Sequence, residues 1–348
     1  MILSDLSNLP GVSGNEDLVR EYIQNEIFPF CDTVTVDRAG NLIGYVRGEP
    51  TNGAATKVML CAHMDEVGFI ISDIDRSGNL KFLPVGGMDA RVLPGCRVLV
   101  GDQDVKGIIG TKPIHLQSEG EFKKAFPMES LRIDIGSDNK KQTDKLVEPG
   151  DYAVFDTEFE EFGDGLYAGK ALDDRAGCAI LIELLRNLKS LSFDLYVCFS
   201  TKEEIGCVGA KVLANTILPD IAIAIEGTTC ADLPGVEPHK VSTTLGKGPV
   251  LAFMDGGSIA DKELNAFLEQ VAKENNIPYQ YKNTTTGGND AAAFQRTARG
   301  ARVASISVPC RYLHSPVSVI SQQDYDNSFY LVSHVVDTLS KQGGKLHV

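Results

Sequence analysis

The feature that most constrains the fold is a change of pattern along the chain. Residues 1–68 and 166–348 alternate between amphipathic helix-like stretches and short apolar runs typical of strands. Residues 69–165 instead contain many short β-like runs, such as FIISDID, CRVLVG and LRIDIG, broken by Gly, Pro and Asp. Strands alternating with helices predict an α/β fold, a mixed sheet with helices on both faces. We therefore predict a discontinuous α/β domain, residues 1–68 and 166–348, interrupted by a small all-β domain, residues 69–165.

Charge and hydropathy exclude several classes of partner. The chain has 348 residues, enough for two domains with separate cores. It carries 33 Lys and Arg against 47 Asp and Glu, and this formal charge of −14 argues against a nucleic-acid or anionic-membrane surface. No stretch reaches the ~18 apolar residues that a membrane span needs. We predict a protein with no nucleic-acid or membrane partner.

The cysteines and the N-terminus predict the compartment. The eight cysteines lie in apolar contexts such as VMLCAHMD and AGCAILIELL, and none forms a CxxC pair. We therefore expect small buried side chains in a reducing environment rather than a disulfide framework or a thiolate zinc site. The first residues, MILSDLSNLPG, lack the basic and long apolar segments of a signal peptide. Together these patterns predict a cytoplasmic protein.

Imidazoles and carboxylates follow several predicted strands of the α/β domain. In open α/β sheets, ligands bind beyond the carboxyl ends of the strands. The candidates at these ends and in the adjoining loops are His63, Asp65, Asp173, Asp174, Glu203, Glu204, Glu226 and His314. Histidine and carboxylate ligands without thiolate suit Zn²⁺, Co²⁺ or Mn²⁺. The set is large enough for two metals that share one carboxylate, which typically lie ~3.5–4 Å apart.

The adjacent glutamates in FSTKEEIGCVGA are the most specific part of this pattern. Two solvated surface charges would be the ordinary interpretation of Glu203 and Glu204. At a bend between a strand and a loop, however, one glutamate can bind a metal while the other addresses a water molecule activated by that metal. The pair therefore predicts hydrolytic chemistry, provided that the other candidates converge on the same place.

Five motifs resemble those of the tetrahedral aminopeptidases: HMDEVGF, GKALDDRAG, STKEEIGCVGA, TGGNDAAAF and RYLHSP. That family of dinuclear metallopeptidases includes glutamyl and leucyl aminopeptidases and members often labelled endoglucanase or cellulase M. The resemblance covers nearly the whole chain in order, including GIIGTKPIHL within the β insertion. It implies a zinc-exopeptidase-like α/β domain and a PDZ-like or barrel-like insertion that takes part in dimerisation and substrate access.

The resemblance also implies the metal ligands. His63 and Glu226 would bind one divalent ion, Glu204 and His314 would bind the other, and Asp173 would bridge the two. Many relatives carry Asp at the position of Glu226, and Glu reaches one methylene further, so metal binding there can differ. Asp232 in ADLPG is a nearby alternative that fits the motif less well. We expect two divalent ions per subunit, Zn²⁺ or Co²⁺ with Mn²⁺ as an option.

The catalytic roles follow from the same resemblance. Glu203 is expected to act as general base and then as general acid, and Asp65 to orient His63 as a carboxylate partner of a metal-binding imidazole. The bond between Asp173 and Asp174 is often cis in related enzymes. Asp174 is also suited to capping the following helix.

Other residues carry weaker expectations. Gly288, Asn289 and Asp290 are expected to line the substrate site. Arg175 can pair with a neighbouring carboxylate or with a substrate group, and Lys247 can favour an acidic substrate or be an inert surface residue. We leave His115 open between a structural role and a subunit contact. The remaining histidines are interpreted as surface or helix residues: His239, His334 and His347.

The predicted activity is a metal-dependent aminopeptidase that removes the N-terminal residue from short peptides, with Glu203 as base. By resemblance the subunits form dimers that assemble into a tetrahedral dodecamer. A deacylase or carboxypeptidase on the same dinuclear centre is the nearest alternative, although such relatives usually carry a different inserted domain. A glycosidase is disfavoured because the chain lacks Trp and has only 7% aromatic residues. A non-catalytic binding protein is the alternative from another class.

Overall fold

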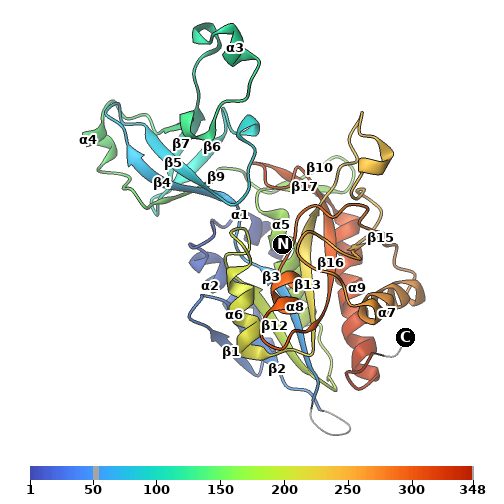
Figure 1. Cartoon of the computed structure of the whole chain (residues 1–348). Coiled ribbons are helices and arrows are strands. Elements are labelled where there is room, and N and C mark those ends of the chain that lie inside the picture. Colours follow the sequence, from blue (N-terminus) through green and yellow to red (C-terminus); the bar gives the residue numbers. More distant parts are fainter. Residues whose placement is uncertain (50–54, 347–348) are drawn as a thin grey trace.

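The computed structural model describes residues 1–49 and 55–346 and shows two bodies of different architecture (Figure 1). The larger body is a mixed sheet with helices on both faces, and the smaller one is a closed antiparallel barrel that projects from it. The predicted fold class is therefore confirmed. The strands of the barrel lie between Gly68 and Phe155, and residues 160–169 already pair within the large sheet.

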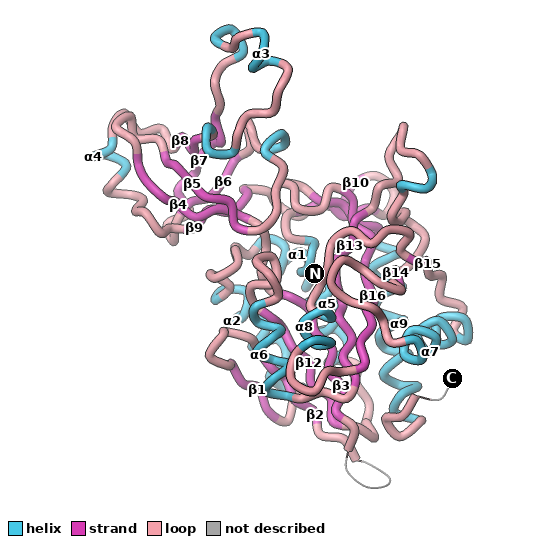
Figure 2. The backbone as a smooth tube through the Cα atoms, in the orientation of Figure 1, coloured by secondary structure: helices cyan, strands magenta, loops and turns pink. Residues whose placement is uncertain are grey.

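The large sheet has 11 strands. Figure 2 shows its central strands in magenta, with helices around them. In spatial order they are β1 (Thr33–Val36), β2 (Leu42–Val46), β12 (Asp194–Ser200), β3 (Lys57–His63), β13 (Ile221–Thr229), β16 (Arg302–Arg311), β17 (Ser318–Ser321), β11 (Leu166–Gly169) and β10 (Glu160–Phe162). Off this path, β14 (Val250–Leu251) pairs with β16, and β15 (Gln280–Tyr281) pairs with β14. Neighbours among the central strands β12, β3, β13 and β16 run parallel. Their carboxyl ends therefore meet at one edge of the sheet, where ligands bind in such folds.

Helices cover both faces of this sheet. They are α1 (Ile2–Asn8), α2 (Asp17–Ile27), α5 (Leu172–Arg186), α6 (Val208–Ile217), α7 (Lys262–Glu274), α8 (Ala291–Arg296) and α9 (Gln322–Lys341). The alternation along β3 shows the two layers: Val58 and Leu60 belong to the core with α5 and α9, whereas Met59 and Cys61 pack with α6 and α8. Both faces of β3 are thus buried, which explains its nearly continuous apolar sequence. Among the described residues, no helix is long and apolar enough to cross a membrane.

The barrel has its own hydrophobic core. Its strands are β4 (Gly68–Ile74), β5 (Leu80–Val85), β6 (Arg97–Val100), β7 (Val105–Gly110), β8 (Arg132–Asp134) and β9 (Tyr152–Phe155), and two short helices, α3 (Glu119–Phe122) and α4 (Lys140–Thr143), lie in its connections. Phe69 packs edge-on against both Phe82 and Phe155 in the interior. β4 pairs with β9 and so closes the barrel, which leaves neither strand as a free sheet edge.

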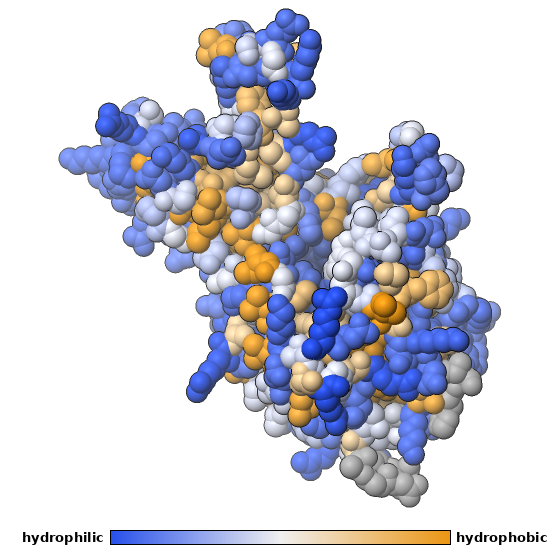
Figure 3. All heavy atoms as spheres, in the orientation of Figure 1, coloured by the Kyte–Doolittle hydropathy of each residue, from blue (hydrophilic) through white to orange (hydrophobic). Residues whose placement is uncertain are grey.

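An arm formed by residues 111–131 extends from the barrel between β7 and β8 (Figure 1). It carries α3 and three exposed apolar side chains: Ile114, Leu116 and Phe122. Figure 3 shows that hydrophilic side chains cover much of the visible face and that apolar ones gather where the barrel meets the α/β domain. The remaining short helices are 3₁₀: η1 (Phe28–Phe30), η2 (Ala90–Val92), η3 (Ile114–Leu116), η4 (Met128–Ser130) and η5 (Pro238–Lys240).

Candidate active site

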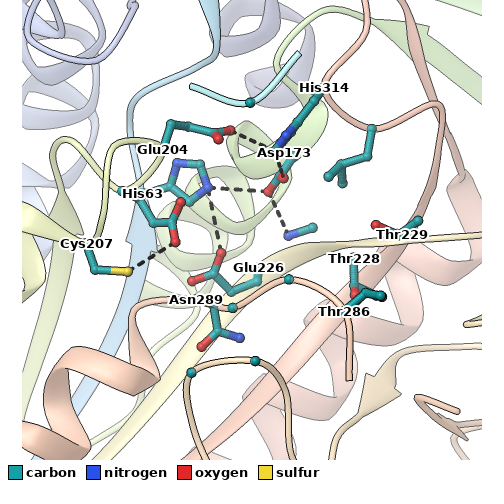
Figure 4. A pocket seen from close by; sticks show the side chains of 18 of the residues that line it. His63, Asp173, Glu204, Cys207, Glu226, Thr228, Thr229, Thr286, Asn289 and His314 are labelled. Atoms are coloured by element: carbon teal, nitrogen blue, oxygen red, sulfur yellow. Dashed lines mark hydrogen bonds and ion pairs between the residues drawn. The ribbon is translucent and has the colours of Figure 1, made fainter. Parts of the chain in front are cut away.

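The parallel strands bring most of the candidate residues to one edge of the sheet (Figure 4). His63 is the last residue of β3 and lies in register with Ser200, the last residue of β12. Glu203 and Glu204 follow in the loop after β12, and Glu226 lies in β13 on the other side of β3. Three neighbouring strands therefore supply four of the predicted site residues, because their carboxyl ends coincide.

Asp173 and His314 reach the same place from other elements. Asp173 lies in the first turn of α5, where the backbone departs from helical geometry and the Asp173–Asp174 peptide bond is cis. Asp174 Oδ1 accepts a hydrogen bond from the Gly177 N–H at 3.0 Å, the capping role predicted for it. His314 lies in the turn between β16 and β17.

The two imidazoles face different oxygens of Asp173. His63 Nε2 lies 3.4 Å from Asp173 Oδ1 and 3.7 Å from Glu226 Oε2. His314 Nε2 lies 3.5 Å from Asp173 Oδ2 and 3.1 Å from Glu204 Oε1. These five side chains therefore form two triads that share Asp173.

The spacing within each triad suits a small divalent cation. Tetrahedral ligands held ~2.0–2.1 Å from Zn²⁺ stand about 3.3–3.4 Å from one another. The imidazole-to-carboxylate distances, 3.1 to 3.7 Å, lie on both sides of that value. The donors are nitrogen and oxygen without sulfur, a set that suits Zn²⁺, Co²⁺ or Mn²⁺. The residues present thus fit the predicted pair of divalent ions.

The electrostatics of the site favour positive charge. Burial raises the pKa of Glu226 well above its usual range, and neighbouring carboxylates add to that shift. Burial likewise raises the pKa of Glu203 to about 8. Burial opposes the charging of His314, yet the carboxylates of Asp173 and Glu204 raise its pKa to about 10. A carboxyl group with proton affinity near neutrality is suited to accept and return a proton.

Asp65 makes more contacts than the sequence led us to expect. Its side chain is fully buried, and Oδ1 lies 3.6 Å from His63 Nδ1. The same imidazole nitrogen is closer, at 3.0 Å, to the backbone oxygen of Asp65. Asp65 Oδ2 accepts a hydrogen bond from Ser13 Oγ at 2.5 Å. The orientation of His63 therefore depends on the backbone of Asp65 as well as on its carboxylate.

Two buried carboxylates accept hydrogen bonds from the backbone of the loop that carries the glutamate pair. The N–H of Glu203 donates to Asp65 Oδ1 at 2.9 Å, and the N–H of Glu204 donates to Asp65 Oδ2 at 3.2 Å. The preceding N–H, that of Lys202, donates to Glu16 Oε1 at 3.1 Å. Hydrogen bonds to charged acceptors are stronger than neutral ones. Asp65 and Glu16 therefore fix the loop from which both glutamates project.

A buried ion cluster supports the turn that carries Asp173. Arg175 is fully buried and donates to the backbone oxygens of Met64 and Leu6 and, at 3.3 Å, to Glu66 Oε1. Lys170 Nζ donates to the same oxygen at 2.7 Å. Arg175 thus pairs with a neighbouring carboxylate, one of the two options left open by the sequence.

A pocket of about 450 Å³ opens in front of the two triads (Figure 4). Gly288 and Asn289 line it, whereas Asp290, which we also expected there, is fully buried and does not line the pocket. Lys282 also lines the pocket, and its Nζ donates to the backbone oxygen of Thr286 at 2.7 Å. Among the described lining residues, Lys282 is the only lysine or arginine. The pocket is therefore acidic near the triads and carries one cation.

Sequence reasoning missed two pocket residues, Lys282 and Cys207. The lysine that the sequence suggested for substrate selection, Lys247, is exposed and does not line the pocket. Lys282 could have been found from its position shortly before the TGGND motif. Cys207 was grouped with buried structural cysteines, yet it is partly exposed and lines the pocket beside the glutamate pair.

The alternative and peripheral candidates lie elsewhere. Asp232 binds Arg311 through two hydrogen bonds of 2.8 and 2.6 Å, so it is not available as a substitute for Glu226. His115 is exposed in the arm, His239 is exposed in η5, and His334 lies partly buried in α9. His347 lies outside the described residues.

The comparisons with known proteins agree with this geometry. The model of the M42 glutamyl aminopeptidase family matches residues 40–331. The chain belongs to this family. The lysyl aminopeptidase of Pyrococcus furiosus is 31% identical over 344 residues, 97% of this chain and 96% of that protein.

Two solved structures extend the match to the whole fold. An aminopeptidase from the archaeon Desulfurococcus kamchatkensis is 34% identical with a TM-score of 0.92, covering 98% of this chain and 95% of that one. The TET1 peptidase of Pyrococcus horikoshii, which can assemble into a tetrahedron or a large octahedral shell, is 36% identical with a TM-score of 0.85. That match covers 96% of this chain and 98% of the TET1 chain. The M42 chain is thus a hydrolase of the metal-dependent aminopeptidase class.

Proposed function

We propose that this M42 chain holds two divalent ions and uses Glu203 to hydrolyse the first peptide bond of short peptides. The observation that carries the assignment is the shared position of Asp173, which presents one oxygen to His63 and the other to His314. In this assignment His63 and Glu226 hold one ion, and Glu204 and His314 hold the other. The ions, when bound, lower the pKa of water and polarise the scissile carbonyl group.

The protein residues would act on protons and on position. Glu203 lines the pocket beside Glu204, and neither histidine lies within ion-pair distance of it. Cys207 Sγ donates to Glu203 Oε1, and the carboxylate can still take a proton from the attacking water. Burial raises the pKa of Glu203 to about 8 in the metal-free site, and this burial favours return of the proton to the leaving amine. Asp65 would hold the backbone of the glutamate pair in place during both transfers.

The acidic pocket supports selection of a free N-terminus. Asp173, Glu203, Glu204 and Glu226 all line it, so carboxylate oxygens are present as acceptors for an α-amine, while two divalent ions would balance their negative charge. An α-amine would donate hydrogen bonds to these oxygens or bind an ion through its nitrogen, whereas an acetylated N-terminus has no basic nitrogen. The enzyme would therefore act as an exopeptidase at the N-terminus.

Lys282 supports a preference for an acidic first residue. Its Nζ has no ion pair within 4.0 Å in residues 1–49 and 55–346, and burial lowers its pKa. A carboxylate on the substrate side chain would supply the missing partner, while a lysine side chain would be repelled. Glycine and threonine line much of the remaining wall, including Gly256, Gly257 and Thr228, and leave room for a side chain. We therefore assign Glu and Asp as the preferred N-terminal residues.

The arm supports assembly of several copies of the chain. Ile114, Leu116 and Phe122 are 59–66% exposed, a costly arrangement unless a partner covers them. The TET1 relative forms closed shells, so we assign this surface to contacts between dimers in a tetrahedral dodecamer. Light scattering of the wild type and of Phe122→Asp measures this directly. A monomeric wild type would contradict the assignment.

The activity is tested on protein stripped of metal by a chelator and then supplied with Zn²⁺, Co²⁺ or Mn²⁺. The substrates are tripeptides beginning with Glu, Leu or Lys, each with a free or an acetylated N-terminus. We expect metal-dependent release of the first residue from free peptides only, fastest for Glu. Cleavage of the acetylated peptides would instead indicate a deacylase or an endopeptidase, and metal analysis after reconstitution would show whether two ions bind per chain.

A further inference from the structure

A third group of potential ligands lies beside the two triads. Glu203, Cys207 and Asp290 each place one donor atom so that all three atoms lie within 4.8 Å of one another. Cys207, labelled in Figure 4, directly precedes α6. Its Sγ lies 3.3 Å from Glu203 Oε1. Neither Cys207 nor Asp290 belongs to the triads described above, and the proposed reaction uses neither side chain.

Asp290 provides an independent sign of a missing partner. Its side chain is fully buried, and Oδ2 accepts a hydrogen bond of 2.5 Å from Ser200 Oγ. Oδ1 has no hydrogen-bond partner in residues 1–49 and 55–346. A buried carboxylate oxygen without a partner is costly, and in native proteins such atoms usually contact an ion or a water molecule. One oxygen of the same carboxylate belongs to the group that Asp290 forms with Glu203 and Cys207.

We propose that Glu203, Cys207 and Asp290 form a third, inhibitory site for a thiophilic divalent cation such as Zn²⁺ or Cd²⁺. Sulfur distinguishes this site from the two triads, because a thiolate favours soft cations and the triads contain none. The Sγ-to-Oε1 distance of 3.3 Å is close to the about 3.5 Å expected between sulfur and oxygen ligands of Zn²⁺. The remaining donors already lie within 4.8 Å of one another, and rotation of the side chains would bring them to that spacing.

The binding step balances without a further reactant. The Cys207 thiol releases its proton to solvent, as does any protonated carboxyl group of Glu203 or Asp290, and the thiolate sulfur and one oxygen from each carboxylate then form three protein ligands. Water occupies the fourth position, which faces the pocket lined by Glu203 and Cys207.

The consequence for activity rests on the proposed role of Glu203. A cation bound to the Glu203 carboxylate removes the proton acceptor from the reaction while the two triads stay intact. The enzyme is then activated at low metal concentration and inhibited when the third site fills. The cation site itself does not depend on that role, so binding and inhibition are measured separately.

Binding is tested on full-length protein that carries Co²⁺ in the triads and is titrated with Cd²⁺. We expect a thiolate-to-Cd²⁺ charge-transfer absorption in the ultraviolet that saturates at one equivalent. Cys207→Ser keeps a hydrogen-bond donor next to Glu203 but abolishes this absorption. Cys96→Ala, which removes a partly exposed thiol of the barrel, leaves it unchanged. An absorption that is absent in the wild type, or that persists in Cys207→Ser, overturns the proposal.

Inhibition is measured on the same proteins, with each activity normalised to that of the same variant without Cd²⁺. We expect Cys207→Ser to shift the inhibitory Cd²⁺ concentration upward by at least ~10-fold, and Asp290→Asn to weaken both the absorption and the inhibition. Equal inhibition of the wild type and Cys207→Ser would refute the inhibitory role even if Cd²⁺ binds. An enzyme inactive with every metal would refute the proposed function, and the absorption would still decide the cation site.

Discussion

The substitution Asp65→Asn tests how strongly the loop of the glutamate pair depends on one buried carboxylate. Asp65 accepts the backbone N–H of Glu203 at 2.9 Å and that of Glu204 at 3.2 Å, and it also accepts from Ser13 Oγ. Asparagine keeps one acceptor oxygen but places an NH₂ group where the other oxygen stood. One of the two backbone donors then faces another donor in a fully buried position.

The magnitude follows from the bonds that are lost. A hydrogen bond to a charged group contributes about 1.5–3 kcal/mol, and an unsatisfied buried donor costs about 1–3 kcal/mol. If the displaced glutamate pair adds about 2–4 kcal/mol of this cost to the activation free energy, kcat decreases roughly 30- to 1,000-fold. KM should change little, because Asp65 does not line the pocket.

Steady-state kinetics on a peptide with a free N-terminal Glu, at measured metal content, provide the assay. Asp75→Asn is the matched control, since Asp75 also accepts two backbone N–H groups, at 2.9 and 3.1 Å, in a turn of the barrel far from the triads. The control should retain wild-type kcat. A fully metal-loaded Asp65→Asn enzyme with kcat within threefold of the wild type would refute the reasoning.

Three further expectations test substrate selection, stability and metal dependence. Lys282→Met should lower kcat/KM for a peptide with N-terminal Glu about 10- to 100-fold and leave kcat/KM for a peptide with N-terminal Leu nearly unchanged. Lys247→Met is the control, and an equal loss on both substrates would contradict the assignment. Glu66→Gln leaves two buried cations without a counter-charge and should lower the free energy of unfolding by about 3–5 kcal/mol in a denaturant titration. The surface pair made by Glu26 should contribute less than about 1 kcal/mol in the same measurement. In metal-free protein the raised pKa of His314, about 10, contributes stability that is fully present below pH 6.5 and is lost as the pH rises through 10. The melting temperature of the metal-free protein should therefore fall across this window more than that of the metal-loaded protein, and parallel curves would contradict this origin of the stability.

The sequence was most informative where neighbouring strands end together. His63, the glutamate pair and Glu226 follow or lie within adjacent parallel strands, and the rule for open sheets places such residues at one edge. The change of pattern after residue 68 likewise marked the barrel, because closed antiparallel sheets alternate short strands with turns. The division of the chain at residues 69–165 stays a prediction, and the strands at residues 160–169 pair with the large sheet.

Contacts between distant loops could not be predicted in this way. Glu16 reaches the N–H of Lys202 across 186 positions of sequence, and no local periodicity encodes that approach. The same holds for the side chain of Lys282, which enters the pocket from a loop without regular structure. Residue type alone predicted a buried Cys207, since a cysteine in apolar surroundings is most often buried, but the side chain is partly exposed. Such contacts depend on how loops pack after the sheet has formed.

The central claim is that Glu203 moves protons while the neighbouring triads hold the metal ions. The most direct test is Glu203→Gln, measured for metal content and for kcat on the same reconstituted sample. We expect the variant to bind as many divalent ions as the wild type and to lose at least ~10²-fold in kcat, because a glutamine cannot accept the proton. A variant that keeps its metal ions and turns over at the wild-type rate would contradict the account.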